Sequence, residues 1–203
     1  MPAAPMNPMN PMDDETARTR LLDAAEALFY AEGIQAVGMD RIRTESGIPL
    51  KRLYRLYPAK ESLVTAYLER RDRRWMASLG AAVEAGRADP VGAVFEWLAQ
   101  WFSEPDFRGC AFLNAYGELG AGPAGVLDVV RRHKAELRAL LAGIAGPGRE
   151  GLAEQLLLLV EGATVVAALE PGPGAAVRAR EAAYVLVGAE DGRTDGGTDG
   201  GTD

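Results

Sequence analysis

Apolar residues recur at intervals of three and four positions along most of this chain, which is the spacing of one face of an α-helix. The first clear case has apolar side chains at Leu21, Ala25, Leu28 and Phe29. No stretch alternates apolar and polar residues for long enough to predict a β-strand. The pattern, with the glycines and prolines that interrupt it, predicts helices over residues 13–32, 39–45, 50–57, 59–86, 90–103, 112–119, 124–143, 148–169 and 174–187. The expected fold class is therefore all-α.

The predicted helices divide the chain into two domains between two tails. Helices over residues 13–60 form a small N-terminal domain, and those over residues 61–187 form a larger helical bundle. Residues 1–12 carry a proline at every third position, and residues 188–203 contain a Thr-Asp-Gly-Gly repeat with no apolar residue after Ala189. Proline interrupts helices, and a segment without apolar residues cannot bury a core, so both ends are predicted to be disordered tails.

Charge is distributed unevenly along the chain. The whole sequence of 203 residues has a net charge of −7, which by itself argues against a nucleic-acid partner. Residues 39–74, however, carry ten Lys or Arg against five Asp or Glu, a net charge of +5 between acidic flanks. A basic segment inside an acidic chain is typical of a nucleic-acid interface, although a solvated helix face gives the same pattern.

The basic segment contains two short predicted helices joined by a turn. The first ends at Gly47 and the second begins at Leu50, which is the outline of a helix-turn-helix. Four side chains are predicted to project outward near the start of the second helix: Lys51, Arg52, Tyr54 and Arg55. This is the part of a recognition helix that enters the major groove. Basic helix pairs also occur in protein-binding modules, so spacing alone leaves both functions open.

The stretch ARTRLLDAAEALFYAEGIQAVGMDRIRTESGIPLKRLYRLYPAKESLVTAYLE, residues 17–69, resembles the N-terminal domain of the TetR family of transcriptional regulators. The matching positions include Leu28 and Phe29 before Gly33, then Gly47, and then Tyr-Pro-x-Lys-Glu-x-Leu over residues 57–63. The resemblance implies a dimeric, all-helical repressor in which a helix-turn-helix DNA-binding domain over residues 13–60 precedes a ligand-binding and dimerisation domain over residues 61–187. It also implies a palindromic double-stranded DNA operator and release by a small-molecule effector.

The resemblance and the outward spacing together give the candidate DNA contacts. These residues are Arg41, Arg43, Thr44, Leu50, Lys51, Arg52, Tyr54, Arg55, Tyr57 and Lys60. Lys51 and Arg52 are the candidates for reading bases. The candidates for holding phosphates are Tyr54, Arg55, Lys60 and Arg41. The chain departs from the family pattern at Pro49, where a capping hydroxyl is usual, and at Lys51 and Arg52, where smaller residues are common. We therefore expect an operator sequence of its own.

Aromatic residues gather between Trp75 and Tyr116, where they predict either a packed core or the wall of an apolar cavity. The cavity interpretation predicts a hydrophobic, neutral or weakly charged effector. The candidate ligand contacts are Tyr67, Trp75, Leu79, Phe95, Leu98, Trp101, Phe102, Phe112, Asn114 and Tyr116.

The predicted helix over residues 148–169 is apolar on nearly all sides, so it must be covered on both. One side can face its own bundle and the other a second copy, and residues 126–144 offer a second such surface. The candidate interface of a homodimer is Val126, Val130, His133, Leu137, Leu141, Leu152, Leu156, Leu159, Val160 and Ala163. We interpret His133 as a packed or interface histidine and Cys110 as a buried one.

Several classes of protein are not expected. The chain has one cysteine and one histidine, which excludes the usual metal centres, and we expect no metal and no cofactor. No GxSxG, HExxH or phosphate-loop motif predicts an enzyme, and the GxGxxG match at residues 146–151 lies between two helices. No secretory signal or membrane span is predicted, which favours the cytoplasm. The alternative function is a helical DNA-binding or protein-interaction module without a small-molecule effector.

Overall fold

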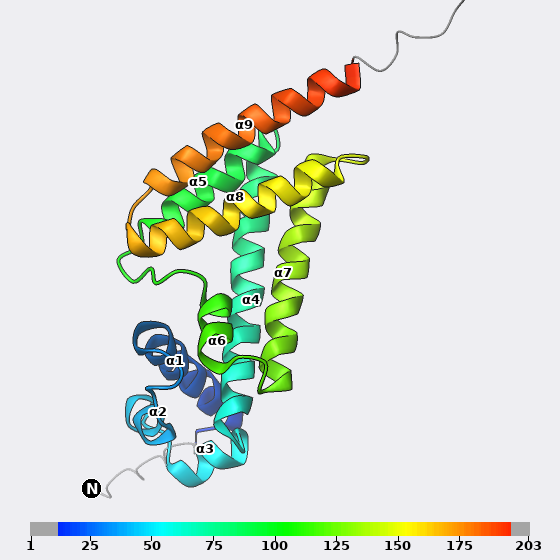
Figure 1. The fold of residues 1–203 in the computed structure, drawn as a ribbon. Coiled ribbons are helices and arrows are strands. Elements are labelled where there is room, and N and C mark those ends of the chain that lie inside the picture. The colour runs from blue at the N-terminus through cyan, green and yellow to red at the C-terminus, as the bar shows by residue number, and fades with distance from the viewer. Residues whose placement is uncertain (1–11, 196–203) are drawn as a thin grey trace, which may run out of the picture. The chain divides into compact units, whose positions relative to one another are not determined.

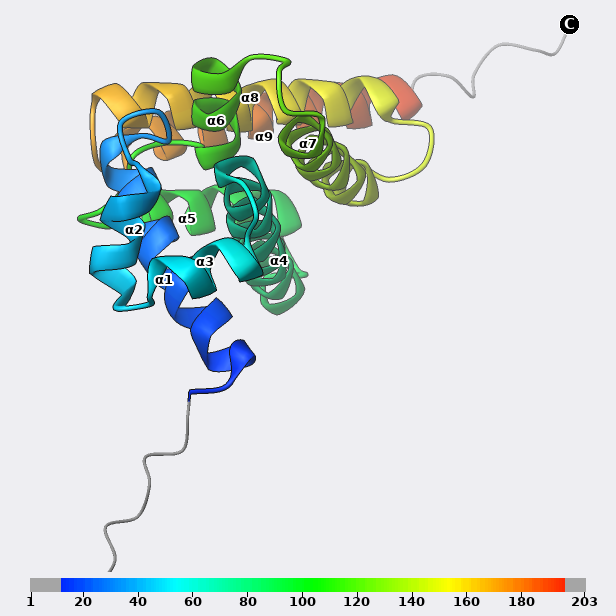
Figure 2. The same ribbon diagram turned by 90° about the horizontal axis from the view of Figure 1, so that it is seen from below.

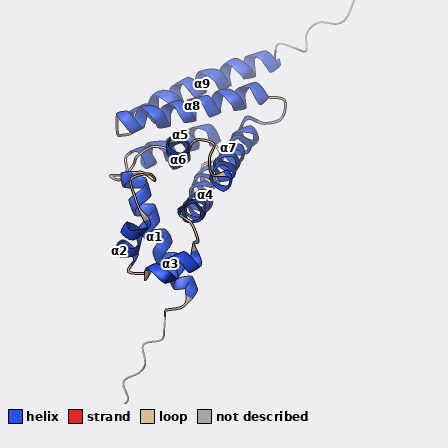
Figure 3. Cartoon of the chain, turned by 60° about the horizontal axis from the view of Figure 1, so that its bottom comes forward, coloured by secondary structure: helices blue, strands red, loops and turns tan. Residues whose placement is uncertain are grey.

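The computed structural model of the protein describes residues 12–195, and all the regular elements in that range are helices (Figures 1 and 3). They are α1 Asp14–Glu32, α2 Met39–Ser46, α3 Leu50–Leu56, α4 Lys60–Ala85, α5 Pro90–Phe102, α6 Ala111–Leu119, α7 Ala124–Ala145, α8 Glu150–Leu169 and α9 Gly174–Asp195. The all-α fold class is confirmed for this part of the chain.

The first eight helices begin and end within two residues of the predicted bounds. The start of α5 is fixed as expected from the sequence. Pro90 occupies the first turn, and the Asp89 side chain accepts a hydrogen bond from the Gly92 amide at 2.9 Å. α8 starts at Glu150 rather than two residues earlier because Gly148 has a φ of +78°, a left-handed conformation that does not continue into a helix.

The last helix is longer than predicted. α9 runs to Asp195, so residues 188–195 are helical and not part of a disordered tail. Gly188 lowers helix propensity by about 1 kcal/mol relative to alanine. No proline follows it to force the helix to end, so α9 continues into the Thr-Asp-Gly-Gly repeat. The rest of the predicted tails, residues 1–11 and 196–203, lies outside the described residues.

The chain forms two compact units, and the first extends to Tyr67 instead of the predicted Lys60. It contains α1, α2, α3 and the first two turns of α4. Its core is formed by apolar side chains that are almost fully buried: Leu21, Phe29, Ile42, Ile48, Leu53 and Leu63. The ring of Tyr67 packs against Phe29 with 5.8 Å between centroids. The predicted ligand contact Tyr67 is therefore part of this core instead.

The second unit begins at Leu68 and contains the rest of α4 together with α5 to α9. Within it, α8 packs against both α7 and α9, and α9 also covers α5 (Figures 1 and 2). The core combines aromatic and aliphatic side chains of these helices. Four of the predicted ligand contacts, Leu79, Phe95, Leu98 and Phe102, are buried members of this core. For these four residues, the packed-core interpretation agrees with the structure.

The structure also corrects the predicted dimer surface. Nine of its ten side chains are buried inside the unit, where they pack against their own chain: Val126, Val130, His133, Leu137, Leu141, Leu152, Leu156, Val160 and Ala163. Leu159 is half-buried against the same core. The exposed apolar side chains of α8 and α9 are others, chiefly Leu158, Val165, Leu169 and Val185, which are between 53% and 82% exposed. Any partner of α8 has to cover this second set, which we call the α8–α9 apolar surface.

By length and composition alone, α8 is the one helix in residues 12–195 that could cross a membrane. Its buried side chains, including Leu152 and Leu156, instead form part of the core of the second unit. A core helix can be as long and as apolar as a membrane-spanning one, and α8 packs as a core helix, against α7 and α9.

Candidate nucleic-acid interface

The turn between α2 and α3 is built by a glycine and a proline. Gly47 ends α2 with a φ of +66°, a left-handed conformation in which only glycine is unstrained. Pro49 then precedes α3, and its carbonyl accepts hydrogen bonds from the amides of Arg52 and Leu53 at 2.9 and 3.0 Å. The fixed backbone of Pro49 thus begins α3 without the side-chain cap that is usual in the family.

Buried apolar residues fix the orientation of α3 and leave one row of side chains exposed. Leu53 is fully buried and Leu56 nearly so, whereas Leu50, Lys51, Tyr54 and Arg55 face solvent. Tyr54 is 44% exposed, which leaves its hydroxyl free to reach a partner. Lys51, Tyr54 and Arg55 therefore face outward as predicted from the sequence. Arg52, which was also predicted to project outward, has a side chain that is only 23% exposed.

Tyr57, which was also predicted to contact DNA, is only 5% exposed. The Arg18 guanidinium lies over its ring at 5.4 Å, and Nη1 of this guanidinium donates a 3.4 Å hydrogen bond to the Leu56 carbonyl. Tyr57 therefore holds α1 against the end of α3, and it is not placed to contact DNA. Lys60 is half-buried, with its ammonium 6.0 Å from the centre of the Phe29 ring.

The predicted contacts on α2 are exposed and form local pairs. Arg41 forms an ion pair with Glu32 at 2.9 Å, and Arg43 forms a longer one with Asp40 at 3.4 Å. The Thr44 hydroxyl donates to the Asp40 carbonyl at 3.0 Å. Exposed ion pairs of this kind contribute about 0–1 kcal/mol. These arginines can therefore exchange their carboxylate partners for phosphates at little cost.

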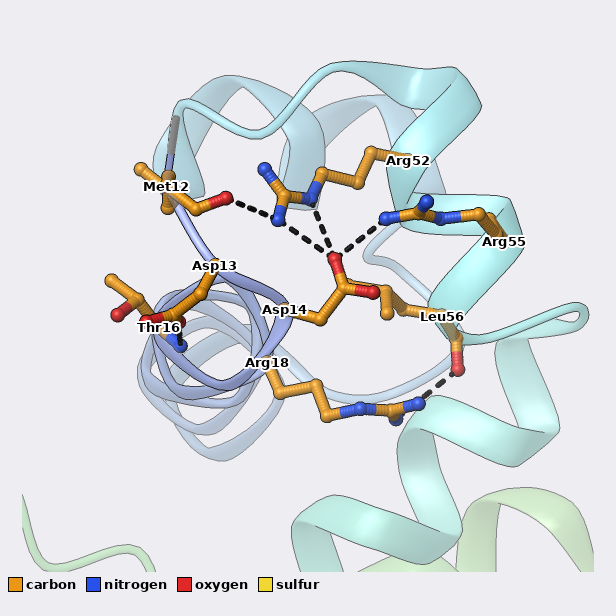
Figure 4. Close-up of polar contacts among 8 residues, drawn as sticks. All are labelled: Met12, Asp13, Asp14, Thr16, Arg18, Arg52, Arg55 and Leu56. Atoms are coloured by element: carbon orange, nitrogen blue, oxygen red, sulfur yellow. Dashed lines mark hydrogen bonds and ion pairs between the residues drawn. The ribbon is translucent and has the colours of Figure 1, made fainter. Parts of the chain in front are cut away.

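Sequence reasoning missed the carboxylate that contacts the two arginines of α3. Oδ1 of Asp14, the first residue of α1, accepts hydrogen bonds from Arg52 at 2.7 and 3.2 Å and from Arg55 at 2.6 Å (Figure 4). Arg52 also donates to the Met12 carbonyl. The hydrogen bonds from Arg52 are the largest cause that holds the pKa of Asp14 below its usual range, so Asp14 is ionised at neutral pH. A separation of 38 residues hides this pair from any local sequence pattern.

The second unit holds a small cavity that brings together three of the predicted ligand contacts, Trp75, Trp101 and Phe112. Its volume is about 10 Å³, room for roughly one water molecule. The wall is completed by polar groups that were not predicted, among them Arg71, His133, Lys134, Glu161 and Thr164. An aromatic wall with a few convergent polar groups is typical of small-molecule sites.

The other two predicted ligand contacts lie outside this cavity. The Asn114 amide donates to the Arg108 carbonyl at 2.9 Å and is exposed. Tyr116 lines an open groove of about 600 Å³ whose wall also includes Leu127, Arg131 and Leu157. The predicted ligand contacts are therefore divided among the cores of the two units, a small cavity and two surface grooves.

A buried hydrogen bond to a carboxylate explains why a histidine lies in the cavity wall. Nδ1 of His133 is 2.8 Å from the Asp72 carboxylate, and the His133 ring stacks on Phe112 with 3.7 Å between centroids. Burial, with the nearby charges of Lys134 and Arg71, lowers the pKa of His133 to about 3, so the ring is neutral at pH 7 and its Nδ1–H donates to Asp72. The packed interpretation of His133 is thus the one the structure supports.

Cys110 is buried, as predicted, and its sulfur lies 3.5 Å from the Lys134 ammonium. Lys134 in turn pairs with Glu161 at 2.6 Å. Within the described residues 12–195, no group of three His, Cys, Asp or Glu side chains is placed to hold a metal ion.

Comparison with known proteins agrees with this geometry. Residues 21–67 match the profile of the family described as bacterial regulatory proteins, tetR family. A TetR-family transcriptional regulator from Streptomyces coelicolor is 33% identical with a TM-score of 0.77, over 85% of this chain and 88% of that one. An HTH-type transcriptional regulator from Mycobacterium tuberculosis, itself uncharacterised, is 29% identical over 71% of this chain and 82% of its own length. The reduced form of NemR from Escherichia coli, at 20% identity and a TM-score of 0.73 over 84% and 97% of the two chains, shares the fold.

Proposed function

Because the chain belongs to the TetR family of bacterial transcriptional regulators, a family of DNA-binding proteins and not of enzymes, we propose that it represses transcription in the cytoplasm as a homodimer on a palindromic operator. The observation that carries this proposal is the exposed row of Lys51, Tyr54 and Arg55 on α3, with Arg52 beside it. A small hydrophobic effector releases the operator.

The two kinds of DNA contact come from different residues. Lys51 and Arg52, in the first turn of α3, read base edges in the major groove, where a guanidinium pairs with guanine through two hydrogen bonds. Tyr54, Arg55, Arg41 and the nearby α2 residues hold phosphates. Phosphate contacts set the position of α3 in the groove, and base contacts supply the preference for one sequence.

The dimer forms through the α8–α9 apolar surface. Leu158, Val165, Leu169 and Val185 are apolar yet largely exposed, and exposed apolar residues gathered on two packed helices support an association surface. A two-fold dimer presents two copies of α3 to successive major grooves, which explains why the operator is palindromic.

The effector occupies an enlarged form of the cavity beside Trp75, Trp101 and Phe112. The cavity of about 10 Å³ is too small for an organic molecule, so binding requires the aromatic wall to move. Trp75 lies on α4, the same continuous helix that supplies Leu63 to the core of the first unit. An effector that favours a displaced α4 therefore weakens operator binding by its coupling free energy, typically about 1–3 kcal/mol.

The direct test is a mobility-shift titration of Arg52→Ala/Tyr54→Ala on DNA fragments that the wild-type protein selects from its own genome. Loss of a base contact and a phosphate contact weakens binding by roughly tenfold to a thousandfold. Arg87→Ala, which removes an exposed arginine in the turn between α4 and α5 and belongs to neither α3 nor the α8–α9 apolar surface, is the control and binds like the wild type. Wild-type affinity in the double variant refutes the assignment of α3.

A reporter gene placed behind the selected fragment tests the sign of regulation and the effector together. Expression rises in cells without the protein, and it rises in cells with the protein after a hydrophobic compound is added. A regulator that no compound releases would instead be the alternative, a helical DNA-binding module without an effector.

A further inference from the structure

The start of α1 is attached to the predicted base-reading arginine by an acidic side chain. Oδ1 of Asp14 accepts hydrogen bonds from both Nε and Nη2 of Arg52, and Nη2 also donates to the Met12 carbonyl (Figure 4). These bonds use Nε–H and both N–H groups of Nη2. Within residues 12–195, Nη1 makes no protein hydrogen bond, so its two N–H groups are available to a ligand.

The two arginines of α3 are held to different degrees. The Arg52 side chain is 23% exposed and has three hydrogen bonds to the start of α1, whereas Arg55 is 61% exposed and has one. A guanidinium that is already fixed through Nε and Nη2 loses little further conformational entropy when its Nη1 binds a ligand. Arg52 is therefore pre-oriented, and Arg55 is a tethered but mobile cation.

We propose that Asp14 is a positioning residue that sets DNA sequence specificity by fixing Arg52 for base reading and by competing with phosphates for Arg52 and Arg55. The inference rests on the proposed role of α3 in the major groove. On a random DNA site, the two guanidinium groups gain only phosphates, and they must leave a carboxylate to do so. On the operator, Arg52 reads a base from the orientation that Asp14 already gives it.

This reasoning predicts opposite effects on the two kinds of site when the carboxylate is removed. Asp14→Asn removes one negative charge from the interface, which strengthens binding to any DNA. The same change frees Arg52 to adopt other orientations, which weakens only operator binding. The ratio of operator affinity to non-operator affinity therefore isolates the orientation effect from the charge effect.

Asp13 offers a matched control on the neighbouring residue. Its side chain accepts a hydrogen bond from the Thr16 amide at 2.7 Å and caps α1, and asparagine caps helices equally well. Asp13→Asn thus removes the same charge from almost the same place while leaving the bonds of Asp14 to Arg52 and Arg55 intact. It strengthens operator and non-operator binding alike, so the ratio stays at the wild-type value.

The experiment measures both affinities for the wild type, Asp13→Asn and Asp14→Asn, over a range of salt concentrations. We expect the ratio to fall about 1.5- to fivefold in Asp14→Asn alone, the range given by an exposed charged contact. Non-operator binding becomes more salt-dependent, with a slope steeper by about 0.9 if one phosphate contact is gained. Circular dichroism and thermal midpoints of both variants check that the fold is unchanged.

The same substitutions in an Arg52→Ala background distinguish the inference from the proposal beneath it. If Asp14 acts through Arg52, Asp14→Asn leaves the ratio of the Arg52→Ala protein unchanged. A ratio in Asp14→Asn equal to that of Asp13→Asn, or an equal loss with and without Arg52, overturns the role of Asp14 alone. Wild-type operator affinity in Arg52→Ala overturns the assignment of α3 as well.

Discussion

Leu158 provides the sharpest test of the α8–α9 apolar surface. Its side chain is 71% exposed although it is surrounded on α8 by apolar residues. Burying a whole leucine side chain contributes about 1.5–3 kcal/mol. The part of Leu158 still exposed therefore represents about 1–2 kcal/mol in each protomer, or about 2–4 kcal/mol in a symmetric dimer. In Leu158→Glu this contribution is lost, and a carboxylate must in addition be desolvated for the dimer to form.

The expected result is a dimer dissociation constant raised by roughly thirtyfold to a thousandfold, since about 1.4 kcal/mol corresponds to a factor of ten. Sedimentation equilibrium from nanomolar to 100 µM protein measures this constant, and operator binding follows the loss of dimer. Ala139→Glu adds the same charge at an exposed position of α7 and leaves the dimer intact. If Leu158→Glu sediments as the wild type does, the dimer forms through another surface.

Two further predictions concern the second unit. The unfolded chain binds a proton at His133 below pH 6.5 while the folded chain binds it only near pH 3, so this histidine stabilises the fold above pH 6.5 and that stability is lost as the pH falls. In urea unfolding of the wild type, the free energy of unfolding should fall by up to about 2 kcal/mol between pH 6.5 and 5. In His133→Asn, whose amide replaces the Nδ1 donor, the free energy of unfolding should fall less steeply with pH. Equal pH dependence in the two proteins contradicts the neutral buried ring. Burial raises the pKa of Asp72, whose effect on stability has the opposite sign: as the pH rises above 3.8, the folded chain keeps this proton longer than the unfolded chain does, and stability falls. Trp101→Ala should change the potency of an effector in operator release, whereas Tyr116→Ala should not, because of these two residues only Trp101 lines the small cavity. Equal potency in both variants and the wild type places the effector elsewhere.

Most of the fold can be predicted from local sequence signals. Helix bounds follow from residues that act on their own backbone, such as Pro90 at the start of α5 and Gly47 at the end of α2. The exposed row on α3 could likewise be predicted, because helical spacing alone separates Lys51 and Tyr54 from the buried Leu53. The end of α9 was missed because glycine in a helix is disfavoured but not forbidden.

What the sequence does not predict depends on contacts between distant residues. Asp14 bonds to Arg52 across 38 residues of sequence, and His133 bonds to Asp72 across 61. Neither pair can be predicted from the periodicity of the sequence. That the side chains predicted for the dimer surface are buried in their own chain was missed for a different reason. α8 is apolar on nearly every side, and periodicity cannot tell which of two apolar faces packs against α7 and α9.

The most direct test of the central claim is the selection of binding sites from random-sequence DNA by the full-length protein, followed by footprinting of the enriched sites. The account predicts an inverted repeat whose half-sites are about one helical turn, or a multiple of it, apart. It also predicts that Arg52→Ala relaxes the preference at one position of each half-site. Enrichment of a single asymmetric site that Arg52→Ala binds unchanged, or of no sequence at all, would contradict recognition of a palindrome by two copies of α3.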